Sequence, residues 1–242
     1  MNLRTTNCSK KNYKFLSQNN EQCVSWVVSK NIVEYEDSLV FMQSYVDKIA
    51  KNEANELVWL LEHPPLYTAG TSAKQADLLD PNKLPVYYSG RGGQYTYHGP
   101  GQRVAYIMLN LKTRKCDIRA YVAALEQWII NSLREFNIIG ERREDRVGVW
   151  LKTAIGEEKI AAIGIRLHKW VSYHGVAINF SPNLENYNGI IACGQKNYGI
   201  TSFAKLGIKA AMSDLDVVLR HNFEQLFGKT IYNKSLPTMD LH

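Results

Sequence analysis

The chain has 242 residues, of which 45% are hydrophobic and 21% are charged, and its formal net charge is +6 at pH 7. This length supports one substantial domain with its own hydrophobic core. No apolar run approaches the roughly 20 residues that span a bilayer. The composition therefore indicates a globular protein that makes no membrane contact.

The four cysteines are sparse and form no recognisable cluster: Cys8, Cys23, Cys116 and Cys193. No C-x-x-C pair occurs, and the spacing of cysteine and histidine does not fit zinc, so we expect no metal. The first apolar stretch, Val24–Val28, is too short for the core of a signal peptide. These features predict a cytoplasmic protein in a reducing compartment.

The positive net charge is compatible with solubility alone or with an acidic partner. No basic stripe with interleaved aromatic residues and no known nucleic-acid-binding motif is present, so we expect no nucleic-acid partner. Residues 1–22 have a basic composition, with no acidic residue before Glu21. A mitochondrial transit peptide is an alternative, but the segment is rich in asparagine and lacks an amphipathic stripe. We expect a poorly ordered N-terminal extension there.

Apolar runs and helical spacing of apolar residues predict the elements in chain order. The expected strands are Val24–Ser29, Leu57–Leu61, Val86–Tyr88, Val104–Leu109, Val147–Leu151, Ile160–Leu167 and Val171–Ile178. The expected helices are Glu34–Lys51, a helix from the N-cap Asp117 to Leu133, and Asp214–Phe227 with Gly228 as C-cap.

Helices and strands are mixed along the chain without strict alternation. This order favours an α+β fold with a largely antiparallel or mixed sheet over a doubly wound parallel sheet. No linker-like tract or repeat interrupts the chain. We therefore expect a single catalytic domain over residues 23–230, followed by a short tail over residues 231–242.

The segment Gly90–Gln102 contains five glycines and a proline, which disfavour regular helix. It lies between two predicted strands, where a glycine-rich turn allows close backbone approach to a ligand, with Arg91 and His98 as polar groups. Its spacing fits neither the dinucleotide-binding fingerprint nor the Walker A loop. A glycine-rich hairpin without a ligand is the alternative interpretation.

Four blocks of residues, in this order and spacing, resemble the lipoate-protein ligase B family of octanoyl-[acyl carrier protein]–protein octanoyltransferases. The blocks are Glu62–Thr68, Arg91-Gly92-Gly93-Gln94 with Tyr97–Gln102, Lys159–Arg166, and His174–Asn179 leading to Cys193-Gly194. Two departures are visible. Ala192 stands where the family usually has proline before the cysteine, and residues 1–22 extend beyond the family's usual start.

The resemblance implies the fold of the biotin/lipoyl protein ligase catalytic domain. It also implies transfer of an octanoyl group from octanoyl-acyl carrier protein to a lysine of lipoyl domains through an acyl-thioester on Cys193. The implied acceptors are the lipoyl domains of 2-oxoacid dehydrogenase complexes and the glycine cleavage H protein. Because a thioester is converted to an amide, neither a cofactor nor ATP is required.

Cys193 and Lys159 are the candidate catalytic residues. Cys193 lies in a loop rich in Asn and Gly; an isolated cysteine of this kind is more often inert, but the family block around it predicts the nucleophile. Lys159 occupies the family's lysine position, where an ammonium favours the thiolate and exchanges protons with the leaving and attacking groups. Taken alone, Lys159 is compatible with an ordinary surface lysine.

The resemblance also implies a substrate-binding set made of three short segments. Its members are Arg91, Gly92, Gly93, Gln94, Tyr95, Thr96, Tyr97, His98, Ala162, Ile163, Gly164, Gly175, Val176 and Ala177. The small and apolar members suit a straight alkyl chain, although ordinary core packing explains them as well. His98 also fits a structural role in the turn, and His174, Arg166, His63 and Glu62 receive no assignment.

Two rival functions remain open at this point. An ATP-dependent lipoate or biotin ligase with the same fold needs no cysteine, and the His98–Gln102 continuation together with Cys193 disfavours it. A non-catalytic module that captures carrier protein or lipoyl domains forms no acyl-enzyme. Dependence on ATP and formation of an acyl-enzyme distinguish the three functions.

Overall fold

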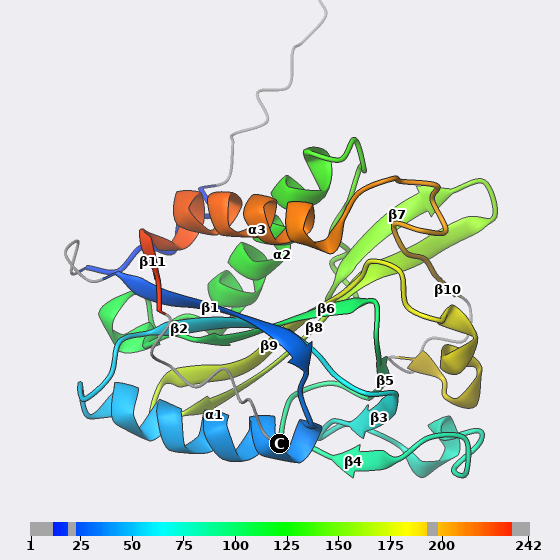
Figure 1. Ribbon diagram of the computed structural model, residues 1–242, viewed down its shortest axis with the longest axis horizontal. Helices are drawn as coiled ribbons and strands as arrows, with labels where there is room; N and C mark the ends of the chain where they lie inside the picture. Colours follow the sequence, from blue (N-terminus) through cyan, green and yellow to red (C-terminus); the bar gives the residue numbers. More distant parts are fainter. Residues whose placement is uncertain (1–11, 19–22, 193–197, 234–242) are drawn as a thin grey trace, which may run out of the picture.

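The computed structural model describes residues 12–18, 23–192 and 198–233, which form a large sheet between helices (Figure 1). The sheet has eight strands, and β7 (Val149–Thr153) lies off the main path as a partner of β8. The others follow the order β10 (Gly199–Ile200), β8 (Gly156–His168), β9 (Val171–Asn179), β6 (Gln102–Met108), β2 (Leu57–Glu62), β1 (Val24–Ile32) and β11 (Thr230–Tyr232).

The large sheet is mixed, as the order of elements predicts. The pairs β8–β9, β9–β6 and β6–β2 are antiparallel, and so is β7–β8. In contrast, β1 runs parallel to β2 and β11, and β10 runs parallel to β8. β7 begins only at Val149 because Gly148, with φ of +126°, breaks the extended conformation expected from Val147 onward.

Helices cover both faces of this sheet. α1 (Tyr35–Ala50) lies on one face, and α2 (Ile118–Arg134) and α3 (Met212–Phe227) lie on the other (Figure 1). Alternate residues of β2 pack to opposite sides: Trp59 joins the core under α1, and Leu60 joins the core under α2 and α3. The run Leu57–Leu61 is apolar throughout because both of its faces are buried.

The predicted helix caps are confirmed. The Asp117 side chain accepts a hydrogen bond of 2.9 Å from the Ala120 amide at the start of α2. Gly228 ends α3 with φ of +109°, a conformation that glycine adopts without strain.

A second, three-stranded sheet packs beside the large one, in the order β4 (Val86–Tyr88), β3 (Leu66–Ala69), β5 (Tyr95–His98). Short 3₁₀ helices in the described ranges include η1 (Gln75–Asp77), η2 (Leu111–Thr113) and η3 (Leu184–Gly189). The small sheet corrects one expectation, because Gly90–Gln102 is not a single turn. Its aromatic and β-branched residues form β5, which pairs antiparallel with β3, a strand that the sequence analysis missed.

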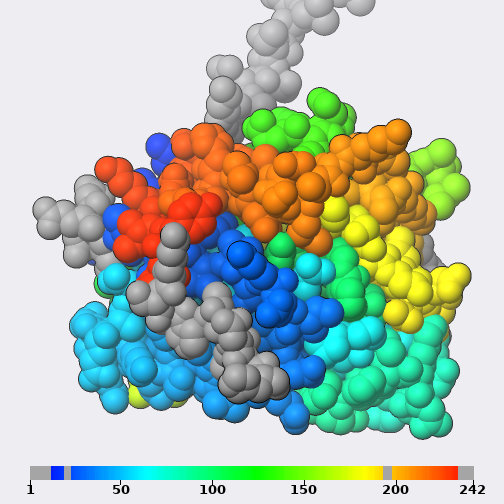
Figure 2. All heavy atoms as spheres, in the orientation of Figure 1, coloured from blue at the N-terminus to red at the C-terminus, as the bar shows by residue number. Residues whose placement is uncertain are grey.

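Both ends of the described chain lie against the domain. Phe15 is 3% exposed and its amide donates to the Leu226 carbonyl at 2.7 Å, so residues 12–18 contribute to the core. At the other end, β11 pairs with β1, and Figure 2 shows the red C-terminal residues directly against the blue strand. The domain boundaries at residues 23 and 230 stay a prediction.

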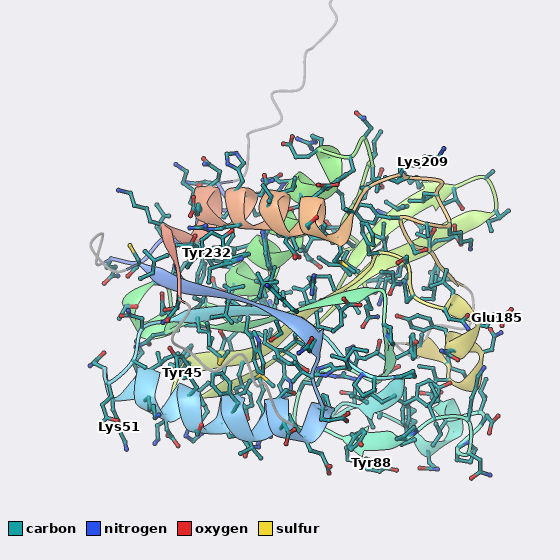
Figure 3. The ribbon with its side chains drawn as sticks, viewed as in Figure 1. Tyr45, Lys51, Tyr88, Glu185, Lys209 and Tyr232 are labelled. Carbon is teal, nitrogen blue, oxygen red and sulfur yellow. The ribbon has the colours of Figure 1, made fainter. Side chains whose placement is uncertain are left out.

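Side chains fill both sides of the large sheet, whereas the labelled Lys51, Tyr88, Glu185 and Lys209 lie at the periphery (Figure 3). In the described ranges, no helix has the length and apolar character needed to cross a membrane.

Candidate active site

A cavity of about 290 Å³ lies where the small sheet and the glycine-rich segment cover strands β6, β8 and β9. Its lining comprises Tyr35, Ser72, Arg91, Gly92, Gly93, Gln94, Thr96, His98, Val104, Tyr106, Asp145, Arg146, Val147, Lys159, Ala162, Ile163, Gly164, His174, Gly175, Val176 and Ala177. All of the predicted substrate-binding residues except Tyr95 and Tyr97 are among them.

Two rows of residues across the large sheet form one wall of the cavity. The register places Ala162 opposite Ala177, which faces Val104, and places Gly164 opposite Gly175, which faces Tyr106. Small side chains in both rows leave space above the strands. This space is open because the sequence has alanine and glycine where larger residues would fill it.

The segment Arg91–Gly93 closes over this wall at short range. The Gly92 amide donates to the Ile165 carbonyl at 3.0 Å, and the Arg91 guanidinium donates to the Thr68 carbonyl at 2.8 Å. A Cβ at Gly164 would lie 3.1 Å from both Arg91 Cδ and the Gly92 carbonyl oxygen, a tight contact that would move the segment Arg91–Gly93 back by a few tenths of an ångström.

Tyr95 and Tyr97 do not line this cavity, and the substrate contacts expected for them stay a prediction. Successive side chains of β5 point to opposite faces, so Thr96 and His98 line the cavity. Tyr95 and Tyr97 pack in a separate buried cluster, in which Tyr97 contacts Tyr187 with ring centroids 5.3 Å apart.

Both ring nitrogens of His98 are engaged inside the protein. Nδ1 is 2.7 Å from Gln102 Oε1 and Nε2 is 3.4 Å from Thr68 Oγ1. Since Gln102 Oε1 only accepts, the hydrogen-bond network assigns the proton to Nδ1. Burial, helped by the nearby His63 and Arg91, lowers the pKa of His98 to about 3. His98 is therefore a neutral wall residue at neutral pH.

Two more buried histidines lie next to His98. Burial lowers the pKa of His63 to about 4, and its ring bridges the Val33 carbonyl and the Tyr106 hydroxyl, each at 2.6 Å. Burial, with Arg91 and Arg166 nearby, lowers the pKa of His174 to about 3. The histidines at this end of the cavity are thus uncharged, which suits an apolar ligand.

Lys159 lies at the other end of the cavity and is 4% exposed. Its Nζ lies 4.5 Å from the centroid of the Trp150 ring, a cation–π arrangement. Across the described ranges, no oxygen accepts a hydrogen bond from this ammonium. The geometry leaves its N–H donors available to a bound group.

Gly148 and Glu126 shape the surroundings of Lys159. A Cβ at Gly148 would lie 3.2 Å from Lys159 Cε, and the Gly148 amide donates to Glu126 Oε1 at 3.0 Å. Burial raises the pKa of Glu126, while this hydrogen bond and the charges of Arg142 and Lys159 act against the rise. Glu126 thereby ties the Gly148 backbone beside the lysine to helix α2.

Cys193 lies outside the described residues. The described chain resumes at Tyr198, whose ring packs edge-on against Trp150 with centroids 5.3 Å apart. The Arg146 guanidinium covers both rings, at 4.0 Å from Tyr198 and 4.6 Å from Trp150. The residue that follows the gap therefore packs against the same ring as Lys159.

Sequence reasoning missed several lining residues. Val104 and Tyr106 lie in a predicted strand, and their alternate spacing beside the glycine-rich segment is a signal that was available. Tyr35 at the start of α1 and the segment 145–147 have no local signal, because only the tertiary structure brings them to the cavity. In the described ranges, no group of three or more His, Cys, Asp or Glu side chains has the arrangement of a metal site.

Solved structures with the same fold include a bi-partite lipoate protein ligase from Thermoplasma acidophilum, with a TM-score of 0.65 and 12% identity over 88% of this chain and 87% of that one. A lipoate-protein ligase A bound with ATP also matches, with a TM-score of 0.65 and 11% identity over 88% of each chain. At this identity the two similarities show the fold alone.

Sequence comparison is more specific. Residues 34–227 match the family model described as the lipoyl protein ligase A/B catalytic domain. An octanoyltransferase of Bartonella tribocorum is 58% identical over 86% of this chain and 89% of its own length. One of Brucella suis is 56% identical over 85% of this chain and 80% of its own length. The chain therefore belongs to the lipoyl protein ligase A/B catalytic domain family, and within that family to the octanoyltransferases.

Proposed function

We propose that this protein transfers an octanoyl group from octanoyl-acyl carrier protein to a specific lysine of lipoyl domains, with Cys193 as the covalent carrier. The observation that carries the proposal is the cavity itself. One wall contains alanine and glycine in both of its rows, the histidines are neutral, and a buried ammonium, that of Lys159, lies at one end. This arrangement suits an alkyl chain whose reacting carbonyl is near the lysine.

In the first half of the reaction, the Cys193 thiolate attacks the carbonyl carbon of the donor thioester. The bond between this carbon and the carrier sulfur breaks, and the carrier thiol leaves with a proton. Lys159 supplies that proton and, as an ammonium, favours the thiolate form of the nucleophile. Proton transfer by a positioned group of this kind contributes about 10²- to 10⁴-fold in rate.

In the second half, the ε-amine of the acceptor lysine attacks the acyl-Cys193 thioester. An amide bond forms, the bond to Cys193 sulfur breaks, and the neutral Lys159 amine takes the proton that the attacking amine loses. Both enzyme groups return to their starting states. Because an amide is more stable than a thioester, the overall transfer needs neither ATP nor a metal.

The proposed partners are octanoyl-acyl carrier protein as donor, and the lipoyl domains of 2-oxoacid dehydrogenase complexes and the glycine cleavage H protein as acceptors. The net charge of +6 is compatible with an acidic carrier protein. A cytoplasmic location is part of the proposal, since a reactive thiol requires reducing surroundings.

The test is intact-protein mass spectrometry after mixing the full chain with octanoyl-acyl carrier protein in the absence of ATP. We expect an octanoyl adduct on Cys193 that disappears when a lipoyl domain is added. Cys193→Ser is expected to form no adduct and to lower transfer by on the order of 10³-fold or more. Cys116→Ser, which alters an exposed cysteine, is the matched control and retains both activities.

Each rival gives a different result in the same experiment. An ATP-dependent ligase modifies the lipoyl domain only when ATP and a free acid are present. A non-catalytic capture module forms no adduct and leaves the lipoyl domain unmodified. A modified lipoyl domain without any acyl-enzyme would contradict the role of Cys193 and indicate direct transfer.

A further inference from the structure

His174 lies at the end of the cavity opposite Lys159. In the β8–β9 register it pairs with Ile165, which lies six residues along β8 from Lys159. At about 3.3 Å per residue, the Cα atoms of Ile165 and Lys159 are roughly 20 Å apart. The β9 residues that line the cavity begin at Ala177, opposite Ala162 and nearest to Lys159 along β8. They end at His174, which is the farthest of them from Lys159 along the strands. Tyr173, the next residue along β9, is outside the lining.

The ring of His174 points to the same side of the sheet as that of its neighbour Tyr173. The two rings are stacked, with centroids 5.0 Å apart and planes at 23°. In a regular strand, consecutive side chains point to opposite faces. The exception arises because His174 has φ of +59°, in the left-handed region that non-glycine residues rarely adopt.

This conformation is costly for a strand residue, and strain of this kind concentrates at functional sites. It turns the His174 imidazole towards Tyr106, with the two ring centroids 6.0 Å apart in an edge-on contact. His174 is 3% exposed. Across the described ranges, the ring nitrogens have no hydrogen-bond partner, so the fold gains no internal hydrogen bond from turning the ring.

The ring is suited to face a hydrocarbon. Tyr106 and Tyr35, which line the same cavity, are also buried and uncharged at neutral pH. An alkyl chain that enters with its carbonyl near Lys159 meets the imidazole at its methyl end. Each additional carbon lengthens an extended chain by about 1.3 Å, given C–C bonds of about 1.5 Å. A rigid ring at the methyl end therefore excludes acyl chains that are only one or two carbons too long.

We propose that His174 is a specificity-determining residue that ends the acyl cavity and sets the longest straight acyl chain that the enzyme transfers. This inference rests on the proposed function, since it assumes that an acyl chain occupies the cavity. Beyond that function, it identifies His174 and its left-handed backbone conformation as the features that select the length of the acyl chain.

The test compares the rates of transfer from a series of acyl-acyl carrier proteins with six to twelve carbons. His174→Gly removes the ring and accepts the left-handed backbone without strain. We expect the ratio of dodecanoyl to octanoyl transfer to rise at least tenfold, the discrimination that one or two methylenes provide in an apolar pocket. Lys169→Gly is the matched control, because Lys169 is also left-handed, with φ of +51°, but lies in the β8–β9 turn outside the cavity.

An unchanged chain-length profile in an active His174→Gly variant would overturn the inference and leave the proposed function intact. Absence of transfer at every chain length in the wild-type protein would instead overturn the proposed function. If His174→Gly does not fold, His174→Asn provides the same comparison, since asparagine tolerates this backbone region and is shorter than histidine. A profile in that variant identical to the wild-type one would equally contradict the proposal.

Discussion

At the scale of single residues, burial keeps the three histidines at one end of the cavity uncharged. His63, His98 and His174 would each be partly protonated near pH 6.5 in an unfolded chain. In the folded protein, burial lowers their pKa values to about 4, 3 and 3. The fold therefore keeps three neutral imidazoles around a cavity with small, uncharged residues along one wall.

This burial predicts sensitivity to acid. Well above pH 6.5 the three histidines are neutral in both states and their titration has no effect. As the pH falls from 6.5 towards 4, the unfolded chain binds protons that the folded chain does not. The free energy of unfolding then decreases by up to about 1.4 kcal/mol per pH unit for each histidine.

Urea unfolding at several pH values between 7.5 and 4.5 measures this dependence. His98→Gln is expected to reduce the slope of the free energy of unfolding against pH by the contribution of one histidine. His221→Gln, at an exposed position on α3, is the matched control and leaves this slope unchanged. An equal slope in wild type and His98→Gln would show that His98 takes up its proton in the folded state.

At the scale of elements, Gln102 and Asn179 join the glycine-rich segment Gly90–Gln102, which covers the cavity, to the strands of the large sheet beneath it. Gln102 Nε2 donates to the Tyr97 carbonyl at 3.1 Å and to Asn179 Oδ1 at 3.0 Å, while its Oε1 meets His98. Asn179 Nδ2 donates to the Thr201 carbonyl at 3.1 Å, and the Thr201 amide donates to the Lys159 carbonyl at 3.0 Å. A continuous set of hydrogen bonds thus connects β5, β6, β9 and β8.

Removal of Gln102 should disturb both stability and transfer. Gln102→Ala leaves the buried His98 Nδ1–H without its acceptor, which costs about 1–3 kcal/mol, whereas Asn179 Oδ1 still accepts from the Tyr187 hydroxyl. We expect a lower midpoint in urea and a reduced kcat for octanoyl transfer, because the cavity wall at His98 loses its support.

Gln127→Ala is the matched control for this prediction, since Gln127 is a half-buried glutamine on α2 away from the cavity. It should change the urea midpoint by less and leave kcat unchanged. A Gln102→Ala variant with wild-type stability and kcat would show that the network is not required.

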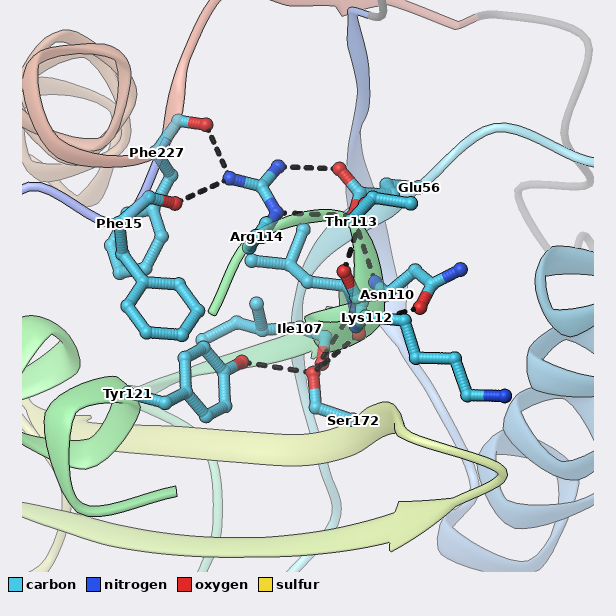
Figure 4. A network of polar contacts seen from close by, with 11 residues as sticks. Phe15, Glu56, Ile107, Asn110, Lys112, Thr113, Arg114, Tyr121, Ser172 and Phe227 are labelled. Atoms are coloured by element: carbon cyan, nitrogen blue, oxygen red, sulfur yellow. Dashed lines mark hydrogen bonds and ion pairs between the residues drawn. The ribbon is translucent and has the colours of Figure 1, made fainter. Parts of the chain in front are cut away.

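At the scale of the whole molecule, one buried ion pair holds distant parts of the chain together (Figure 4). The Arg114 guanidinium pairs with Glu56 and donates to the Phe15 and Phe227 carbonyls, each at 2.6 Å. Glu56 also accepts from the Asn110 amide at 2.8 Å. The segment before β1, the start of β2 and the end of α3 therefore meet at this one side chain.

Arg114→Met should destabilise the entire domain. It leaves the Glu56 carboxylate buried without its partner, and a broken buried pair costs about 3–5 kcal/mol. We expect a large decrease in the urea midpoint, while the folded fraction retains its transfer kinetics because Arg114 lies outside the cavity lining.

The double variant Arg114→Met with Glu56→Gln is the control. It removes the unpaired charge of Glu56 and should recover part of the stability that Arg114→Met loses. A single variant as stable as the wild type would contradict the role assigned to the pair.

Local patterns were sufficient for much of this structure. Apolar periodicity predicted α1, α2 and α3 to within about two residues. As predicted, Asp117 caps the start of α2 with its side chain, and Gly228 ends α3 with a positive φ. The strand β5 was missed because its pairing with β3 outweighs the glycines around it. The position of Tyr95 and Tyr97 outside the cavity lining could not be predicted, because strand alternation cannot be applied before a strand is recognised.

The sequence by itself determined the fold class, the family, the glycine-rich covering segment and the position of Lys159, since each depends on local residue types and their order. Only the tertiary structure decided the remaining cavity walls, because they come from pairing between strands far apart in sequence. His174 is the clearest case: its place depends on a single left-handed backbone conformation, which the surrounding sheet and rings stabilise and no local pattern predicts.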